Sequence, residues 1–302
     1  MIVLDKLPEI FQYSSSLALG FFDGLHLGHQ KVIQNAIDMS KQLCTKSVIL
    51  TFQNHPVELL YNVKPEFIKT PDERIKLFQK LGVDIVVMPE FSRDIAILNA
   101  QQYFDQIIMK FNPKSITTGF NHHFGSQQSG NSAFFIKKSK EYDFIFREIE
   151  AVKIKNEIIS STLIRNAIKA GDVEIAAKLL LEPYKIKNMV KEGDKRGKTL
   201  GYPTANLEIP ENKIAPKAGV YFGYVSVGNI KYKAVANAGF HPTFNIAPKE
   251  ILEVHILDFD RDIYGETIEF TFIEKLRDEI KFKTAEALKE QMALDVAKAG
   301  SL

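Results

Sequence analysis

The feature that most constrains the fold is a change of pattern near residue 182 of the 302-residue chain. Before it, short apolar runs of strand type alternate with amphipathic helical stretches, which predicts a parallel sheet covered by helices. After it, β-branched and aromatic runs with close-set Gly and Pro show no helical period, which predicts an all-β unit. We therefore expect two domains, an α/β domain at 1–184 and a β domain at 185–302 that ends in a helix.

Individual elements follow from the same patterns. In the first domain we expect strands at 16–19, 47–52, 83–88, 115–118 and 144–149, and helices at 28–43, 71–81, 99–111, 161–169 and 173–181. In the second, runs at 220–227 and 230–236 flank Gly228-Asn229 and predict a hairpin. A last helix is expected at 284–299, with Thr284 as its cap.

Composition excludes several function classes. The balance of 39 Lys+Arg against 37 Asp+Glu is far from the basic excess of a general nucleic-acid binder. One cysteine, Cys44, can form neither an internal disulfide nor a cysteine metal cluster. No apolar run approaches about 18 residues, and the start lacks a signal-peptide pattern. We expect a cytoplasmic protein with neither nucleic-acid nor membrane partners.

A glycine- and histidine-rich run lies where the first strand gives way to the first helix. Ligands bind at this carboxyl edge in open α/β sheets, where the helix N-terminus offers free N–H groups. Histidines can donate hydrogen bonds to phosphate oxygens, although a His-x-x-His pair could also bind a metal or cap a turn. The candidate nucleotide-binding residues of this run are Gly20, Phe22, Asp23, Gly24, His26 and His29.

Two further segments can bind anions or substrate in the first domain. Ser160-Ser161-Thr162 begins a predicted helix, and Arg165 follows one turn later, so hydroxyls and a guanidinium come together. An ordinary helix cap with a solvated arginine gives the same pattern. Asn121 follows the strand at 115–118 and is expected at the same sheet edge as the histidines.

The β domain contains a glycine-rich basic loop from Gly193 to Leu207 that suits ATP phosphates and includes Gly197 and Lys198. Thr204 and Asn206 alternate by two on an extended chain, so they face one side and can share a magnesium ion with phosphate oxygens. A β-turn with solvated lysines is the alternative.

Together these motifs resemble the bacterial bifunctional riboflavin kinase/FAD synthetase family. The resemblance rests on G-x-F-D-G-x-H-x-G-H at 20–29, S-S-T-x-I-R at 160–165 and Pro-Thr-Ala-Asn at 203–206, with further similar blocks at 237–244, 252–259 and 276–279. It implies a Rossmann-like nucleotidyltransferase domain, in which FMN attacks the α-phosphate of ATP, and a small antiparallel β-barrel that phosphorylates riboflavin. Mg²⁺ is the implied cofactor, and riboflavin, FMN and ATP are the implied partners.

The resemblance also implies residue roles. His26 and His29 would steady the triphosphate, with Arg165 and the hydroxyls of Ser161 and Thr162 on its other side. Asn121 would lie near the bound substrates. In the barrel, Glu253 would accept the proton of the riboflavin 5′-hydroxyl, although an outward-facing strand glutamate gives the same local pattern. The implied remaining contacts are Thr204 and Asn206 to Mg²⁺, and Gly197, Lys198 and Arg277 to nucleotide or flavin.

Two departures from the family pattern bear on these roles. His122 stands where the family usually has an aromatic residue, which affects the flavin contact. Lys198 stands where arginine is frequent, and lysine keeps the charge without the bidentate geometry.

Three other functions remain open at this stage. One is a monofunctional FAD synthetase whose β domain only binds flavin. Another is a flavin sensor without turnover. The third is a cytidylyl- or pantetheine-phosphate adenylyltransferase, which leaves the β domain unexplained.

Overall fold

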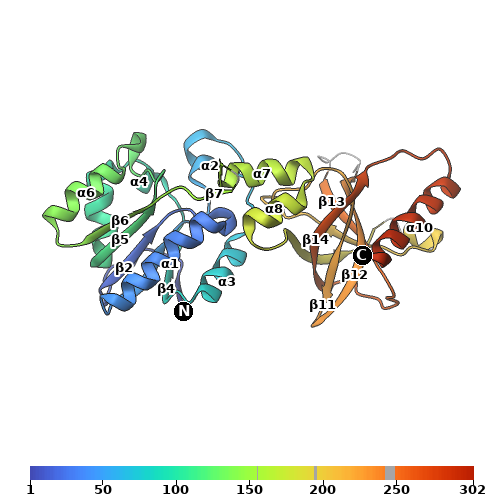
Figure 1. Ribbon diagram of the computed structural model, residues 1–302, viewed down its shortest axis with the longest axis horizontal. Helices are drawn as coiled ribbons and strands as arrows, with labels where there is room; N and C mark the ends of the chain where they lie inside the picture. Colours follow the sequence, from blue (N-terminus) through green and yellow to red (C-terminus); the bar gives the residue numbers. More distant parts are fainter. Residues whose placement is uncertain (155, 194–195, 242–248) are drawn as a thin grey trace. The chain divides into compact units, whose positions relative to one another are not determined.

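The structure is a computed structural model that describes residues 1–154, 156–193, 196–241 and 249–302 (Figure 1). Its contacts divide it into two units, Met1–Ser161 and Thr162–Leu302. The division groups helix α8 (Val173–Leu180) with the second unit, where it contacts strand β14 (Thr267–Asp278). The domain boundary expected at 184/185 therefore stays a prediction.

The first unit contains a six-stranded sheet in which every neighbouring pair is parallel, as predicted. The order across the sheet is β1 (Ile2–Leu4), β4 (Ile85–Val87), β3 (Lys46–Leu50), β2 (Ser15–Leu19), β5 (Pro113–Gly119) and β6 (Ile145–Ile149). The strands after β2 run outward on one side, and β5 returns to its other side. The reversal of strand order between β2 and β5 is where doubly wound sheets bind their ligands.

Helices connect these strands. They are α1 (Leu27–Gln42), α2 (Pro56–Tyr61), α3 (Pro71–Leu81), α4 (Arg93–Ala96), α5 (Ala100–Tyr103) and α6 (Ser132–Glu141). Helix α7 (Ser161–Ala170) begins at the last residue of the first unit, and the rest of it belongs to the second unit. The short helices η1 (Asp23–Leu25), η2 (Phe104–Ile108), η3 (Met109–Phe111) and η4 (Ser126–Gln128) and the strand pair β7 (Lys153–Ile154) and β8 (Glu157–Ile158) complete the unit. The helix expected at 99–111 is instead a succession of α, π and 3-10 turns.

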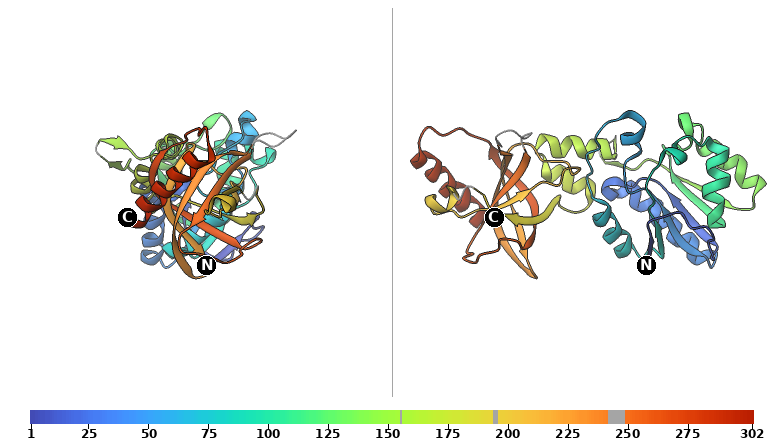
Figure 2. Two further views of the ribbon diagram at one scale, coloured as in Figure 1. Left: turned by 90° about the vertical axis from the view of Figure 1, so that its right-hand side faces the viewer. Right: turned by 180° about the vertical axis from the view of Figure 1, so that it is seen from behind.

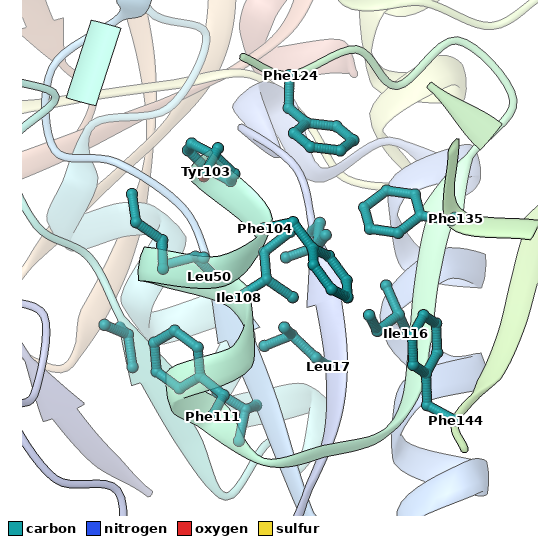
Figure 3. Packing of buried hydrophobic residues seen from close by; sticks show 14 of the residues in the cluster. Leu17, Leu50, Tyr103, Phe104, Ile108, Phe111, Ile116, Phe124, Phe135 and Phe144 are labelled. Atoms are coloured by element: carbon teal, nitrogen blue, oxygen red, sulfur yellow. The ribbon is translucent and has the colours of Figure 1, made fainter. Parts of the chain in front are cut away.

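Alternate residues of each strand pack on opposite sides of the sheet, as the two-residue period requires. Leu17 of β2 lies in a cluster rich in aromatic rings, which includes Phe104 and Phe135 (Figure 3). Ala18 faces the other side, where it packs with buried residues of α1 and α3 such as Ile33 and Phe78. Two cores therefore hold β2 fixed, and the loop that follows it begins from a rigid position.

The second unit is a closed antiparallel barrel, as the resemblance implied. Its strand order is β10 (Ala205–Glu208), β13 (Lys249–Ile256), β12 (Ile230–His241), β11 (Gly219–Val227), β14 and β9 (Lys185–Lys191). The predicted hairpin is confirmed, since Val227 pairs with Ile230 and Gly228 has φ of 58°. Helix α9 (Arg196–Leu200) precedes β10, and helix α10 (Ala285–Ser301) ends the chain.

Helix α10 packs on the outside of the barrel, against β12 (Figure 2). Ala299 is buried there with Val220 and Phe222. Thr284 caps the helix as expected, because its hydroxyl accepts a hydrogen bond from the Ala287 amide at 3.2 Å. Within the described part of the chain, we find no helix of the length and apolarity that a membrane span requires.

Candidate functional sites

The first candidate site lies at the carboxyl ends of β2 and β5. Gly20 directly follows β2, and Asn121 lies two residues beyond the end of β5. Because β2 and β5 pair in parallel, these two loops leave the sheet side by side. This edge is also the point where the strand order reverses, so the fold brings Asn121 to the predicted place.

The loop between β2 and α1 has an unusual backbone. Phe22 has φ of 58°, Gly24 of 80° and Leu25 of 48°, so three of four consecutive residues are left-handed. For Phe and Leu this conformation is strained, and such strain clusters at functional sites. A Cβ on Gly20 would lie 2.8 Å from the Phe22 ring, so glycine is required for that ring to fold back.

His26 and His29 are brought together as the motif predicts. Their rings stack with centroids 3.7 Å apart and an interplanar angle of 20°. His26 caps α1, and its Nδ1 accepts a hydrogen bond from the His29 amide at 3.3 Å. Burial lowers the pKa of His26 from 6.5 to about 4, and the Asp23 carboxylate opposes this shift. His26 is thus neutral at pH 7, and its proton belongs on Nε2 because Nδ1 is an acceptor.

Asp23 has a role that the motif does not reveal. Its carboxylate is only 2 % exposed and accepts hydrogen bonds from the amides of Ile68 and Lys69, both at 3.0 Å. It therefore ties the loop before α3 to the histidine loop. Its predicted contact with nucleotide stays a prediction, and the observed contacts make it a positioning residue.

Arg74 is a fully buried residue of α3 that sequence reasoning missed. Its Nη1 donates to the Phe21 carbonyl at 2.8 Å, and its Nη2 donates to the Phe52 carbonyl at 2.8 Å. Its guanidinium also lies over the Phe21 ring, 4.6 Å from the centroid. The side chain thus joins the loops that follow β2 and β3. Burial lowers its pKa to about 10, so it remains charged at pH 7.

The serine-threonine segment begins α7, as expected. Ser161 is the first residue of α7, and its hydroxyl donates to the Asp23 carbonyl at 3.0 Å. Thr162 and Arg165 lie in the first turns of the same helix but belong to the second unit. Their approach to the histidine pair stays a prediction. Asn121 is exposed, and its Oδ1 lies 3.7 Å from a Cβ built on Gly119.

The second candidate site is a row of polar residues across three barrel strands. Asn206 of β10 pairs directly with Glu253 of β13, and Glu253 pairs with Asn237 of β12. Directly opposed residues share a face of the sheet. The next residues along these strands, such as Leu207 and Val254, point to the other face and are buried, so the polar row lies on the outer face.

The glycine-rich loop packs closely on this row. A Cβ on Gly193 would lie 2.2 Å from Nδ2 of Asn206, and one on Gly197 would lie 3.3 Å from the Thr204 hydroxyl. Glycine therefore lets the loop backbone approach both predicted magnesium ligands. The side chain of Lys198 and residues 242–244 of the similar block lie outside the described part of the structure.

Two side chains near the barrel site hold neighbouring segments in place. His255, which sequence analysis left unassigned, contacts the Pro203 carbonyl through Nδ1 at 2.9 Å and packs on Tyr202. It fixes the segment that leads into Thr204. Arg277 forms a bidentate pair with Asp295 of α10, with Nη2 2.7 Å from Oδ2. It holds the terminal helix, and its predicted flavin contact stays a prediction.

The described residues contain no group of three or more His, Cys, Asp or Glu side chains placed to hold a metal. The hydroxyl of Thr204 and the amide of Asn206 offer oxygen atoms without charge. Mg²⁺ keeps several waters and is commonly bound by few protein oxygens together with substrate phosphates. The residues present fit that kind of site.

Comparison with known proteins assigns the two parts of the chain to two different families. A family model for FAD synthetase matches residues 9–163, and one for riboflavin kinase matches residues 180–302. A protein of Listeria monocytogenes is 35% identical over 281 residues, which span 92% of this chain and 89% of that protein. One of Escherichia coli is 30% identical over 295 residues, spanning 97% and 94%. Both are called bifunctional riboflavin kinase/FMN adenylyltransferase.

A solved structure has the same fold over the whole chain. It comes from Streptococcus pneumoniae, is described as a macrolide-efflux protein and is 34% identical. Its TM-score is 0.90, with 100% of this chain and 99% of that chain covered. An experimental structure therefore contains the folds of both units in the same order along its chain.

Proposed function

The chain belongs to the family of bifunctional riboflavin kinases/FMN adenylyltransferases, and on that premise we propose how its two units divide the work. The barrel phosphorylates riboflavin to FMN with ATP. The α/β unit then transfers the adenylyl group of a second ATP to FMN, which yields FAD and pyrophosphate. The observation that carries this proposal is the presence of both family matches, each over its own half of the chain.

In the kinase reaction we assign the role of proton acceptor to Glu253. Its carboxylate accepts the proton of the riboflavin 5′-hydroxyl while that oxygen attacks the γ-phosphorus of ATP, and ADP leaves. Thr204 and Asn206 would hold Mg²⁺, which neutralises charge on the phosphate oxygens. The backbone amides of Gly193 and of Gly197 in α9 would contact the phosphates. Support comes from the shared face of Asn206 and Glu253 and from the loop's close approach to them.

In the adenylyl transfer no protein base is needed, because the attacking FMN phosphate is already an anion. An oxygen of that phosphate attacks the α-phosphorus of ATP, and pyrophosphate leaves. His26 would donate a hydrogen bond from Nε2 to a triphosphate oxygen, and the stacked His29 ring fixes its position. Such catalysis depends on orientation and on stabilising developing charge. Arg165 and Thr162 are proposed to contact the phosphates from α7.

Two substitutions test the division of work in the full chain. Glu253→Gln keeps the shape of the side chain and removes the proton acceptor, so FMN formation should fall at least a hundredfold while FAD formation from FMN is unchanged. In His29→Asn, FAD formation from FMN should fall while FMN formation from riboflavin is unchanged. An unchanged kinase rate in Glu253→Gln would contradict the proton assignment. Loss of both activities in either variant would contradict the separation of the sites.

We further propose that the enzyme acts in the cytoplasm and that Mg²⁺ is required for both reactions. Titration of each reaction with EDTA and re-addition of Mg²⁺ tests the second point. Activity that persists at full chelation would contradict it.

A further inference from the structure

Helix α7 carries Thr162 and Arg165, which are proposed to contact the phosphates of ATP, and its first residue is held by the histidine loop. The Ser161 hydroxyl donates to the Asp23 carbonyl at 3.0 Å. The helix ends at Ala170, so it is only about 15 Å long, and its own hydrogen bonds make it a stiff element. Contacts that hold its carboxyl end therefore also affect where Arg165 lies.

The carboxyl end of α7 is held by the barrel. The Ile168 carbonyl accepts two hydrogen bonds, from the Gly171 amide at 2.9 Å and from the Lys217 amide at 3.2 Å. Lys217 lies in the segment that leads into strand β11, so the barrel supplies one of the donors that the last turn of a helix needs. All three residues belong to the second unit.

Tyr221 of β11 fixes this donor in place. Its side chain is buried, and its hydroxyl donates to the Lys217 carbonyl at 2.5 Å. Burial and the carboxylates of Asp278 and Asp172 raise the pKa of Tyr221, so the hydroxyl keeps its proton and remains a donor. The Lys217 ammonium lies 3.1 Å from Oδ1 of Asp278, so the side chain of Lys217 is bound to the barrel as well.

The Tyr221 ring points away from the proposed kinase site. Tyr221 pairs with Ala236, the residue before Asn237. Asn237 and Glu253 belong to the polar row on the outer face, so Tyr221 faces the inside of the barrel. Its ring packs there on Phe272. Loss of its hydroxyl therefore leaves the polar row intact.

We propose that Tyr221 and Lys217 are positioning residues for the adenylyl transfer, although both lie in the barrel. The proposal rests on the proposed function, in which Arg165 and Thr162 contact the phosphates of ATP. Tyr221 holds Lys217, the Lys217 amide holds the end of α7, and α7 presents Arg165. Loosening this chain of contacts should weaken ATP binding in FAD formation and leave the kinase reaction unchanged.

The test uses Tyr221→Phe in the full chain, with Tyr184→Phe as the matched control. Tyr184 is also buried and packs on Phe272, but its hydroxyl donates to the Ile214 carbonyl. We expect Tyr221→Phe to raise the KM for ATP in FAD formation at least fivefold and to change the KM for ATP in FMN formation less than twofold. Tyr184→Phe should leave both KM values unchanged, even where both variants unfold at lower urea concentrations.

A second pair of variants perturbs the same junction from the helix side. In Gly171→Ala the new Cβ would lie 3.0 Å from the Tyr221 hydroxyl, and alanine is strained at φ of 85°. The control Gly265→Ala meets a similar strain at φ of 78°, but no described atom lies within 4 Å of its Cβ. Gly171→Ala should reproduce the selective rise in the ATP KM, and Gly265→Ala should match the wild type in both reactions.

The two reactions give different answers if the proposal fails. An unchanged ATP KM for FAD formation in Tyr221→Phe or Gly171→Ala would overturn it. Equal rises in both reactions, or an equal rise in Tyr184→Phe, would also overturn it, because they would indicate general damage to the barrel. A wild-type protein that forms no FAD from FMN would instead overturn the proposed function of the α/β unit.

Discussion

Replacing Arg74 by Met should separate two loops at the adenylyltransferase site. The guanidinium donates to the Phe21 and Phe52 carbonyls at 2.8 Å. Hydrogen bonds from a charged donor contribute about 1.5–3 kcal/mol each, or about 3–6 together. Burial opposes this by about 3 kcal/mol, because it lowers the pKa of Arg74 from 12.5 to about 10. The difference is at most about 3 kcal/mol, and this is the loss of stability that we expect for Arg74→Met.

Urea unfolding followed by far-UV circular dichroism measures this loss, since the chain has no tryptophan. The melting temperature of the first unit should fall by about 6–12 °C, at about 2–4 °C per kcal/mol for a unit of this size. Arg74→Lys should recover little, because one ammonium cannot span both loops. The exposed Arg93 of α4 provides a control, Arg93→Met, that should leave stability unchanged.

The substitution should affect only the activity of the α/β unit. In Arg74→Met, kcat/KM for FAD formation from FMN should fall at least tenfold, and the riboflavin kinase rate should be unchanged. Wild-type stability in Arg74→Met, or full recovery in Arg74→Lys, would refute the reasoning that the two-pronged guanidinium holds the loops.

Three further predictions concern the two sites. The pKa of His26 is about 4 in the folded protein, below the value of 6.5 expected in the unfolded chain. Between these pH values the unfolded state binds more protons than the folded state, so the stability falls as the pH drops from 6.5 to 4. This loss should reach roughly 3 kcal/mol and shrink in His26→Gln; equal pH slopes in urea titrations would contradict it. Gly193→Ala forces a Cβ to within 2.2 Å of Asn206, so kinase activity should fall at least tenfold and FAD formation should persist. His255→Phe loses the contact with Pro203 and should lower the kinase kcat several-fold without changing the melting temperature; a wild-type kcat would remove its positioning role.

Much of the fold was predictable because the apolar periods are strong. The helix at Pro71–Leu81 was predicted with its observed bounds from the proline at its first turn. The structure adds a capping box between Thr70 and Glu73, and Gly82 ends the helix with φ of 85°. Strand β1 was missed, because three residues are too few to show a period. The residues at 104–108 form a π-helix in which Phe104 is buried, and no local sequence pattern reveals the change from α-helix.

The sites were predictable only where short-range spacing determines geometry. His26 and His29 lie within one turn, so their meeting follows from the sequence. Arg74 joins loops that lie 22 and 53 residues away in the chain, and its burial depends on tertiary packing. Likewise, the row from Asn206 to Asn237 depends on the register of three barrel strands, which is fixed only when the barrel closes.

The most direct test of the bifunctional assignment is a time course of flavins. The purified protein is incubated with riboflavin, ATP and Mg²⁺, flavins are separated by chromatography, and a parallel reaction starts from FMN. We predict that FMN appears before FAD in the first reaction and that FAD forms without delay in the second. FAD from FMN with riboflavin untouched would contradict the kinase assignment of the barrel, and no product in either reaction would contradict the account as a whole.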